Sequence, residues 1–440
     1  MNKKLMAVAV AGALAAPVAM AQSNVTISGR MSMGVDSYSA QGATTAGGGI
    51  VSRSRVWDNG SRLIIQGNED LGNGLKAVFY TETGFNADNG LSTGNNGAAS
   101  TNVNMIGSRI AFAGVEGGFG KLTVGRQHVF WTNGIIDQSQ TNYVQAGTPF
   151  QTGSFGSGMG VGITRQPNTV QYASPTINGF NAVVSWSPNV QESVQTTSVG
   201  TAASAADAKG RLWGLTAQWT GGPFQAAYDW VENRGNGQAL AAVATVAATG
   251  VGNTFGTVTG VTTGHKVRAG WSYQPGAVVG LIWTRSEIKN GGAGQTLGYI
   301  AATSGLGIAA GSGTTLKQSA WTLNWEHLMG NTRYLAQFSK AGNIRGCESQ
   351  ATITVAGVSG VSACDNTSAK SYMLGVQYLL SKRTSVHVVY NQITNAGNYF
   401  ADYTSGGNSS FTSTGNTVGT VSGMAGADPK MFGVGLQHNF

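Results

Sequence analysis

The sequence predicts an all-β fold, a 16-stranded antiparallel transmembrane β-barrel. Many short stretches alternate between apolar and polar residues, and because successive side chains of a strand point to opposite faces, each stretch has one apolar face. Charged residues make up only 10% of the chain and 67 of its 440 residues are glycine, whereas soluble domains carry about 25% charged residues. After residue 21 no apolar run reaches the roughly 18 residues of a membrane helix, which leaves a closed barrel as the structure that satisfies its backbone in lipid.

Residues 1–21 have the features of a secretory signal peptide. Lys3 and Lys4 give a basic start, Leu5–Met20 is apolar, and Ala19 and Ala21 form an Ala-x-Ala cleavage site. A membrane-spanning helix would be longer and flanked differently. We therefore expect the mature chain to begin at Gln22 and residues 22–440 to form the barrel.

The predicted strands come in pairs joined by tight turns on one side and long loops on the other. Gly72-Asn73-Gly74 is a typical example, since Asn-Gly is a strong hairpin signal. Their number is even, as in bacterial single-chain barrels. The predicted strands are Val25–Tyr38, Ser61–Leu71, Leu75–Asn86, Ile106–Glu116, Lys121–His128, Thr169–Ser174, Phe180–Ser187, Arg211–Thr220, Phe224–Glu232, His265–Gln274, Val278–Ile288, Lys317–Met329, Thr332–Gly342, Lys370–Leu380, Thr384–Thr394 and Lys430–Phe440.

The alternation also predicts which face of each strand is turned inward. In His265–Gln274 the basic Lys266 and Arg268 oppose the apolar Val267 and Trp271. A charge facing lipid at mid-membrane costs about 2–4 kcal/mol, so the charged face should line the lumen. Arg285 shares its parity with apolar neighbours, which indicates a strand-end position or a β-bulge.

The net charge of the chain is +8, from 26 basic and 18 acidic residues. Two of the basic residues belong to the expected signal peptide, so the mature chain carries +6. The basic residues stand singly inside strands rather than in runs, which argues against a nucleic-acid partner and for a charged lumen. Glu82 and Glu326 are expected lumen acids that offset part of this charge.

A soluble β-sandwich also alternates, but it would not need so many strands with short turns all on one side. The carboxy-terminal strand favours the barrel. Phe432, Val434 and Leu436 share one face, and the chain ends on the aromatic Phe440.

Several segments resemble the trimeric porins of Gram-negative bacteria, in particular the betaproteobacterial type. They are spread along nearly the whole mature chain: SRLIIQGNEDLGNGLKAVFYTETGF (61–85), GKLTVGRQ (120–127), TRQPNTVQYASPTINGF (164–180), YLLSKRTSVHVVY (378–390) and the terminal GVGLQHNF (433–440). The chain departs from the family where Ala173 replaces a usual acid and Gln171 takes a place often charged.

The resemblance implies a homotrimer of water-filled pores in the outer membrane, in contact with lipid and lipopolysaccharide. Small hydrophilic solutes and ions would pass by passive diffusion, without a cofactor. It also implies that the third loop, residues 129–164, folds inward and narrows each pore. A loop of that length with little structure of its own is in any case expected to be functional.

An arginine ladder is then expected to face the acid of the third loop, Asp137. By their position on the inward face, the wall residues are predicted to be Arg30, Arg62, Arg109, Arg126 and Arg165, with Lys76 lower down. Each could equally be a solvated or structural lumen charge. The basic wall predicts a mild preference for anions.

Cys347 and Cys364 are predicted to be bridged, because both lie in one loop of an exported chain. The bridge would close roughly 18 residues, worth about 3 kcal/mol in the chain-entropy model. Two free thiols are the alternative; a metal site is disfavoured because no histidine lies near either cysteine.

Two other functions have weaker support. A lipase-like barrel would need catalytic motifs, but the five histidines are scattered and no Gly-x-Ser-x-Gly is present. The stretch 305–310 matches a dinucleotide fingerprint only by its letters, because no βαβ unit surrounds it. A secreted adhesin of β-solenoid type would share the composition, but no repeat of fixed period occurs.

Overall fold

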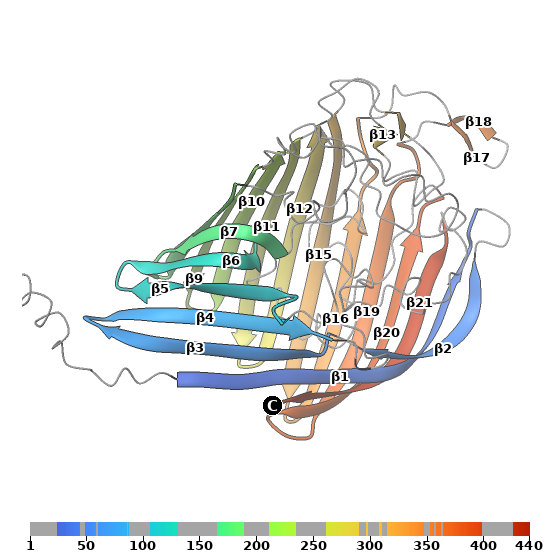
Figure 1. Ribbon diagram of the computed structural model, residues 1–440. Helices are drawn as coiled ribbons and strands as arrows, with labels where there is room; N and C mark the ends of the chain where they lie inside the picture. Colours follow the sequence, from blue (N-terminus) through green and yellow to red (C-terminus); the bar gives the residue numbers. More distant parts are fainter. Residues whose placement is uncertain are drawn as a thin grey trace, which may run out of the picture.

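The computed structural model describes most of the chain beyond residue 23. The described residues are 24–44, 49–58, 60–85, 87, 106–130, 165–188, 211–234, 261–289, 296–297, 308–309, 315–346, 353–355, 358–361, 364–397 and 426–440. All regular secondary structure in these described residues is β-strand (Figure 1). In this part of the chain no helix is long and apolar enough to cross a membrane.

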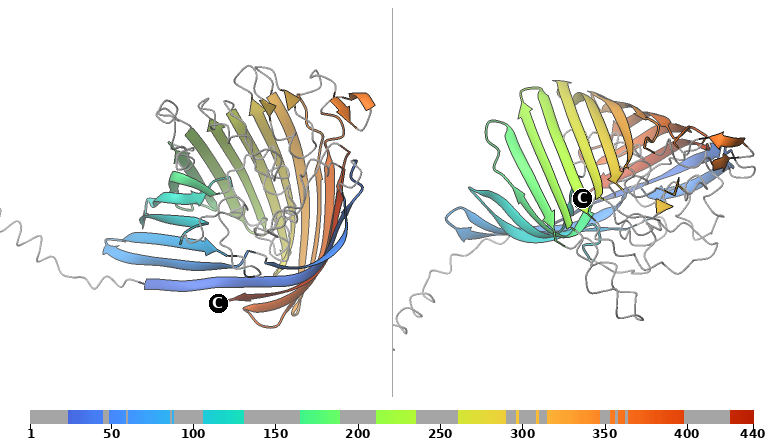
Figure 2. Two further views of the ribbon diagram at one scale, coloured as in Figure 1. Left: turned by 45° about the vertical axis from the view of Figure 1, so that its right-hand side comes forward. Right: turned by 90° about the horizontal axis from the view of Figure 1, so that it is seen from above.

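The strand β1 (Asn24–Gln41) closes the sheet into a barrel. One of its edges pairs antiparallel with β21 (Asp428–Asn439), and the other pairs with β3 (Arg62–Gly72) and β2 (Ile50–Asp58). Figures 1 and 2 show the strands following one another in chain order until the red β21 lies beside the blue β1. The predicted antiparallel barrel is therefore confirmed.

The other strands of the wall pair antiparallel with their neighbours along the chain. They are β4 (Leu75–Gly84), β5 (Ile110–Gly117), β6 (Gly120–His128), β7 (Arg165–Ala173), β8 (Phe180–Ser187), β9 (Arg211–Gly221), β10 (Phe224–Arg234), β11 (Val261–Gln274), β12 (Ala277–Lys289), β15 (Thr315–Met329), β16 (Thr332–Ala341), β19 (Ala369–Leu379) and β20 (Thr384–Asn395). Two small hairpins stand outside this sheet: β13 (Thr296–Leu297) with β14 (Ile308–Ala309), and β17 (Ile353–Val355) with β18 (Val358–Val361).

The strands β2 and β3 form one interrupted strand along the same edge of β1. Met33 pairs with Asp58 and Arg30 pairs with Arg62, so one extra residue stands on the β2–β3 side, as in a β-bulge. The Oδ1 atom of Asp58 accepts the N–H groups of Gly60 (2.7 Å) and Ser61 (2.9 Å). Counted in this way, the 17 bonded strands occupy sixteen positions in the wall, the predicted number.

The burial of β21 follows the predicted alternation. Phe432, Val434 and Leu436 are about half exposed on the outer face, whereas Met431 and Gln437 are buried on the inner face. The apolar face of the strand is therefore turned outward, toward the lipid.

Arg285 lies on the outer face toward the end of β12. The pairing of β12 with β15 is regular from Ala277 to Lys289, so no bulge occurs at this position. The Nε atom of Arg285 lies 2.8 Å from Oε1 of Glu287, and Nζ of Lys317 lies 3.8 Å from the same oxygen. Arg285 therefore lies on the apolar side because it is close to the end of the strand, one of the two predicted explanations. There its charge is paired with Glu287.

The two ends of the barrel differ in the length of their connections. Asn73 and Gly74, with φ of 52° and 76°, form the two-residue turn of the β3–β4 hairpin, as the Asn-Gly signal predicts. Such short turns gather at one end, and the strand ends that the long connections join lie at the other, with the small hairpins β13–β14 and β17–β18 (Figure 1).

Candidate functional site

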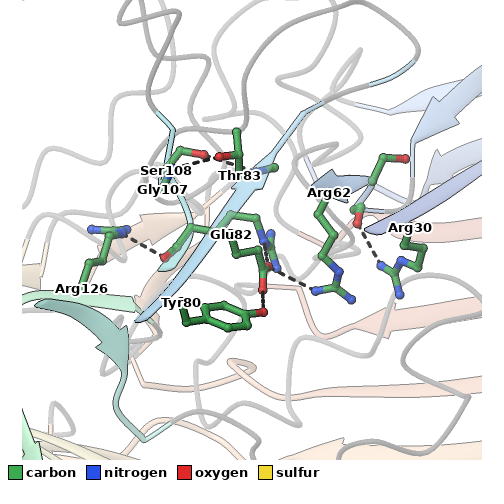
Figure 3. Close-up of polar contacts among 12 residues, drawn as sticks. Arg30, Arg62, Tyr80, Glu82, Thr83, Gly107, Ser108 and Arg126 are labelled. Atoms are coloured by element: carbon green, nitrogen blue, oxygen red, sulfur yellow. Dashed lines mark hydrogen bonds and ion pairs between the residues drawn. The ribbon is translucent and has the colours of Figure 1, made fainter. Parts of the chain in front are cut away.

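The carboxylate of Glu82 is the centre of a charged cluster on the inner wall. Glu82 lies in β4 and is only 4% exposed. Its Oε1 atom accepts a hydrogen bond from Nε of Arg109 and lies 3.4 Å from Nη1 of Arg62, while Tyr80 donates its hydroxyl hydrogen to Oε2 at 2.9 Å. The alternation of β4 turns Tyr80 and Glu82 inward together (Figure 3).

Arg109 is held in place by the turn that precedes β5. The N–H of Gly107 donates to Oγ1 of Thr83 at 2.9 Å, and the N–H of Arg109 donates to the carbonyl of Glu82 at 3.0 Å. These bonds fix the 106–109 turn against β4, as Figure 3 shows for Gly107 and Thr83. The guanidinium of Arg109 is thereby directed at the Glu82 carboxylate.

Two further arginines are held by backbone carbonyls. The Nε atom of Arg126 donates to the carbonyl of Arg109 at 3.1 Å, and Nη2 of Arg30 donates to the carbonyl of Gly60 at 3.1 Å (Figure 3). Arg30 is directly opposite Arg62 in the β1–β3 ladder. Like charges directly opposite repel one another, and the Glu82 carboxylate, 3.4 Å from Arg62, offsets the charge of one of the two.

Arg165, the first residue of β7, belongs to the same cluster. It interacts electrostatically with Glu82 and with Arg62, Arg109 and Arg126. The structure therefore places Arg62, Arg109 and Arg165 about the carboxylate of Glu82, which the sequence analysis treated only as an offsetting acid. Arg126 and Arg30 lie beside this group, through the carbonyl of Arg109 and opposite Arg62.

Two other predicted site residues are not part of this cluster. Lys76 lies six residues from Glu82 along β4, or about 20 Å in an extended strand, next to the short-turn end and opposite Glu116. Asp137 and the rest of the loop beyond residue 130 lie outside the described residues.

Each of three further acids on the inner wall has an arginine partner, a pattern that the sequence did not reveal. The pairs are Asp36 with Arg55 (2.7 Å), Asp229 with Arg268 (2.8 Å) and Glu326 with Arg333 (3.0 Å). Alternation predicts that these side chains face inward, but the pairing depends on the register between strands.

The first residues of the third loop turn into the barrel. Val129 and Phe130 are buried with Leu212 of β9 and Val231 of β10. Nζ of the fully buried Lys266 donates to the carbonyl of Phe130 at 3.1 Å and lies 4.7 Å from the centre of its ring. Gly214 leaves room for the side chain of Val129, because a Cβ atom at position 214 would lie only 2.6 Å from Cγ1 of Val129.

Of the two positions that depart from the porin pattern, Gln171 connects neighbouring strands. Gln171 donates from Nε2 to the carbonyl of His128 (3.0 Å) and to Oγ of Ser185 (2.9 Å), so it links three neighbouring strands. Ala173 ends β7 opposite Lys121.

The match to a known protein family covers most of the chain. The model of the Gram-negative porin family matches residues 7–398. The chain is a Gram-negative porin. The family is one of outer-membrane channel proteins rather than enzymes, and this member crosses that membrane many times with the strands of its barrel.

Individual relatives of this porin come from betaproteobacteria. An outer membrane porin protein of Bordetella pertussis is 29% identical over 58% of this chain and 66% of its own length. The outer membrane porin protein 32 of Delftia acidovorans is 30% identical (51% and 58%), and the major outer membrane protein P.IB of Neisseria gonorrhoeae is 32% identical (43% and 49%). The porin thus aligns with about half to two thirds of these curated relatives.

Solved structures share the fold over nearly the whole chain. The anion-selective porin from Comamonas acidovorans gives a TM-score of 0.59 at 19% identity, covering 95% of this chain and all of that one. The in-vitro folded OmpT of Vibrio cholerae in its trimer form gives 0.55 at 13% identity, covering 95% and 99%. At these identities the likeness shows the barrel fold alone.

Of the two cysteines of this porin, the structure describes one. Cys364 is buried and disulfide-bonded, and no cysteine among the described residues is free. Cys347 lies outside the described residues, so the predicted pairing stays a prediction.

Proposed function

We propose that this porin forms a water-filled channel for the passive diffusion of small hydrophilic solutes and ions, with a mild preference for anions. The observation that carries the proposal is the Glu82 cluster, in which Arg62 and Arg109 lie against one carboxylate and Arg165 interacts with it. Arg126 and Arg30 add positive charge beside them, Arg126 bonded to the carbonyl of Arg109 and Arg30 opposite Arg62. The other inner-wall acids Asp36, Asp229 and Glu326 are each neutralised by an arginine. The described wall therefore offers an excess of positive charge to a permeating ion.

The size of this charge sets the strength of the preference. One charge about 5 Å from an ion in water contributes roughly 0.8 kcal/mol, and 0.1 M salt screens charges beyond about 10 Å. Several such charges favour anions by a factor of a few to about ten, without excluding cations. The porin of the same fold from Comamonas acidovorans is known as anion-selective, which agrees with this proposal.

The third loop, residues 129–164, is proposed to narrow the channel opposite the arginines, with Asp137 facing them. The inward course of Val129 and Phe130 supports this proposal. The signal peptide 1–21 and a mature barrel of residues 22–440 complete the proposed organisation, and lipid and lipopolysaccharide are its proposed surroundings.

Swelling of liposomes that contain the purified porin tests passive diffusion. Uncharged sugars should enter at rates that fall steadily with molecular size and do not saturate with concentration. Saturable entry of one sugar, or no entry of any, would contradict a general diffusion channel.

The porin is proposed to assemble as a homotrimer, in line with the trimer form named for the similar OmpT structure. A closed barrel with its backbone bonded internally resists detergent, so the trimer should persist until heated. Light scattering of the unheated protein in mild detergent should give the mass of three chains; the mass of one would oppose the proposal.

The partner of Cys364 is proposed to be Cys347, the other cysteine of the chain. Alkylation followed by intact-mass measurement should show two modified thiols only after reduction. Two modified thiols in the unreduced sample would refute the pairing.

A further inference from the structure

Two aromatic side chains lie side by side on the inner wall, between Glu82 and the short-turn end of the barrel. Tyr80 of β4 is directly opposite Phe112 of β5, and their rings are stacked with centres 5.6 Å apart and planes inclined by 12°. Both side chains are half-buried, and the alternation of their strands turns them toward the lumen. This aromatic step (Tyr80 and Phe112) therefore interrupts a wall that is charged above and below it.

The two sides of the aromatic step meet different neighbours. On the β6 side, Nζ of Lys121 lies 5.3 Å from the centre of the Phe112 ring. On the β3 side, the residue opposite Tyr80 is Gln66, which is exposed and has no ring. Because Phe112 covers one face of the Tyr80 ring, the face turned toward Gln66 is the one on which a further ring can stack.

A cation lies at the rim of that face. Nη1 of Arg62 is 3.4 Å from Oε1 of Glu82, and Tyr80 donates its hydroxyl hydrogen to Oε2 of the same carboxylate at 2.9 Å (Figure 3). Arg62 belongs to β3, as Gln66 does, and its side chain is 20% exposed. Between them on the same inner face lies the half-buried Ile64, an apolar side chain beside the ring.

Arg62 also keeps hydrogen-bond donors for a second carboxylate. Its contact with Glu82 is long for a hydrogen bond, whereas Arg109 makes the closer contact with the same oxygen. A guanidinium carries five N–H donors in a planar fork that fits a carboxylate with two parallel bonds. An aromatic face, an apolar side chain and a guanidinium thus adjoin one another on the inner faces of β3 and β4.

We propose that Tyr80 and Arg62 bind aromatic carboxylates among the anions that pass through the channel. The ring of the solute stacks on the face of Tyr80 turned toward Gln66 and contacts Ile64, while its carboxylate accepts hydrogen bonds from Arg62. An aliphatic acid lacks the π face, and an uncharged ring lacks the charge. This inference rests on the proposed function, because it names a class of solute for the same channel.

Block of the single-channel chloride current by benzoate tests the proposal. Cyclohexanecarboxylate is the reference, because it has a similar size and the same charge but no aromatic ring. Benzoate should halve the chloride current at about fivefold lower concentration, since that is the contribution of an aromatic pair beyond the area it buries. Equal half-blocking concentrations of the two acids would overturn the proposal.

Two substitutions of Tyr80 separate its ring from its hydrogen bond. Tyr80→Leu and Tyr80→Phe both lose the bond to Glu82, but only Tyr80→Leu loses the ring. Tyr80→Phe should keep the fivefold difference between the acids, and Tyr80→Leu should reduce it to below about twofold. Phe79→Leu is the matched control, because it removes a ring from the outer face of the same strand and should behave as the native porin does.

Arg62→Gln should raise the half-blocking concentration of both acids about fourfold, because one charge near the carboxylate is lost, and should leave their ratio unchanged. Circular dichroism of each variant shows whether the barrel is folded. Loss of the difference in Tyr80→Phe, or in Phe79→Leu, would overturn the proposal. A native porin that passes chloride but is blocked alike by both acids would overturn this inference alone, whereas one that conducts no ions would overturn the proposed function and this inference with it.

Discussion

At the scale of single residues, Glu82 sets how much positive charge the inner wall presents. Its carboxylate lies against Arg62 and Arg109 and interacts with Arg165. Alternation places Arg30 and Arg62 on the inner face, as the sequence predicted. Arg109 lies in the turn before β5, and Arg126 shares the parity of the exposed Leu122 and Val124, next to an irregularity in the β6–β7 pairing. The central place of Glu82 was not predictable, because it depends on register and on the turn that presents Arg109.

Glu82→Gln should strengthen the anion preference about two- to threefold, because one negative charge near the permeating ion is removed. The reversal potential in a KCl gradient measures this change. Tyr80→Phe is the matched control, since it removes the hydrogen bond to Glu82 without changing the charge. An unchanged preference in Glu82→Gln would mean that the permeation path avoids the cluster.

Lys266 is proposed to tether the base of the third loop through the carbonyl and ring of Phe130. Lys266→Met should leave Val129 and Phe130 less firmly held, so single channels should show more frequent brief closures and a broader spread of conductance. Lys382→Met, on an exposed turn far from the lumen, should behave like the native porin. Identical current traces for the two variants would argue against the tether.

At the scale of the elements, the hairpins could be predicted and one strand could not. Gly72-Asn73-Gly74 predicted its turn because Asn-Gly accepts the left-handed conformation found there. The strand β2 was missed because Ser52 and Ser54, rather than apolar residues, alternate with Arg53 and Arg55. Because the segment has no apolar face, its sequence is typical of a loop. Its backbone pairing with β1 is what identifies it as a strand.

Asp58 stabilises the interruption between β2 and β3 by accepting two backbone N–H groups. Asp58→Ala should lower the free energy of unfolding by about 1–3 kcal/mol, because those buried donors lose their acceptor. Asp70→Ala is the control: Asp70 accepts the N–H of Gly72 in the same way, but at an exposed turn, and should cost less. Urea unfolding in detergent or vesicles compares the two, and equal losses would show that burial of the Asp58 turn adds nothing.

At the scale of the whole molecule, the barrel combines a lipid-facing outer wall with a basic inner wall. The closure of β1 on β21 and the alternation of every strand follow from the sequence pattern, because lipid excludes unpaired backbone and charged side chains. The ion pairs of the lumen depend on the register between neighbouring strands, as for Asp36 with Arg55 and Glu326 with Arg333. These pairs decide how much of the basic charge remains to act on a permeating ion.

The reversal potential of the native porin in a planar bilayer, under a tenfold gradient of KCl, tests the central claim most directly. The arginines at and beside Glu82 predict the sign of chloride selectivity, with chloride favoured by a factor of a few to about ten. The variant Arg62→Ala/Arg126→Ala should move the potential toward zero. A native reversal potential with the sign of potassium selectivity would contradict the account.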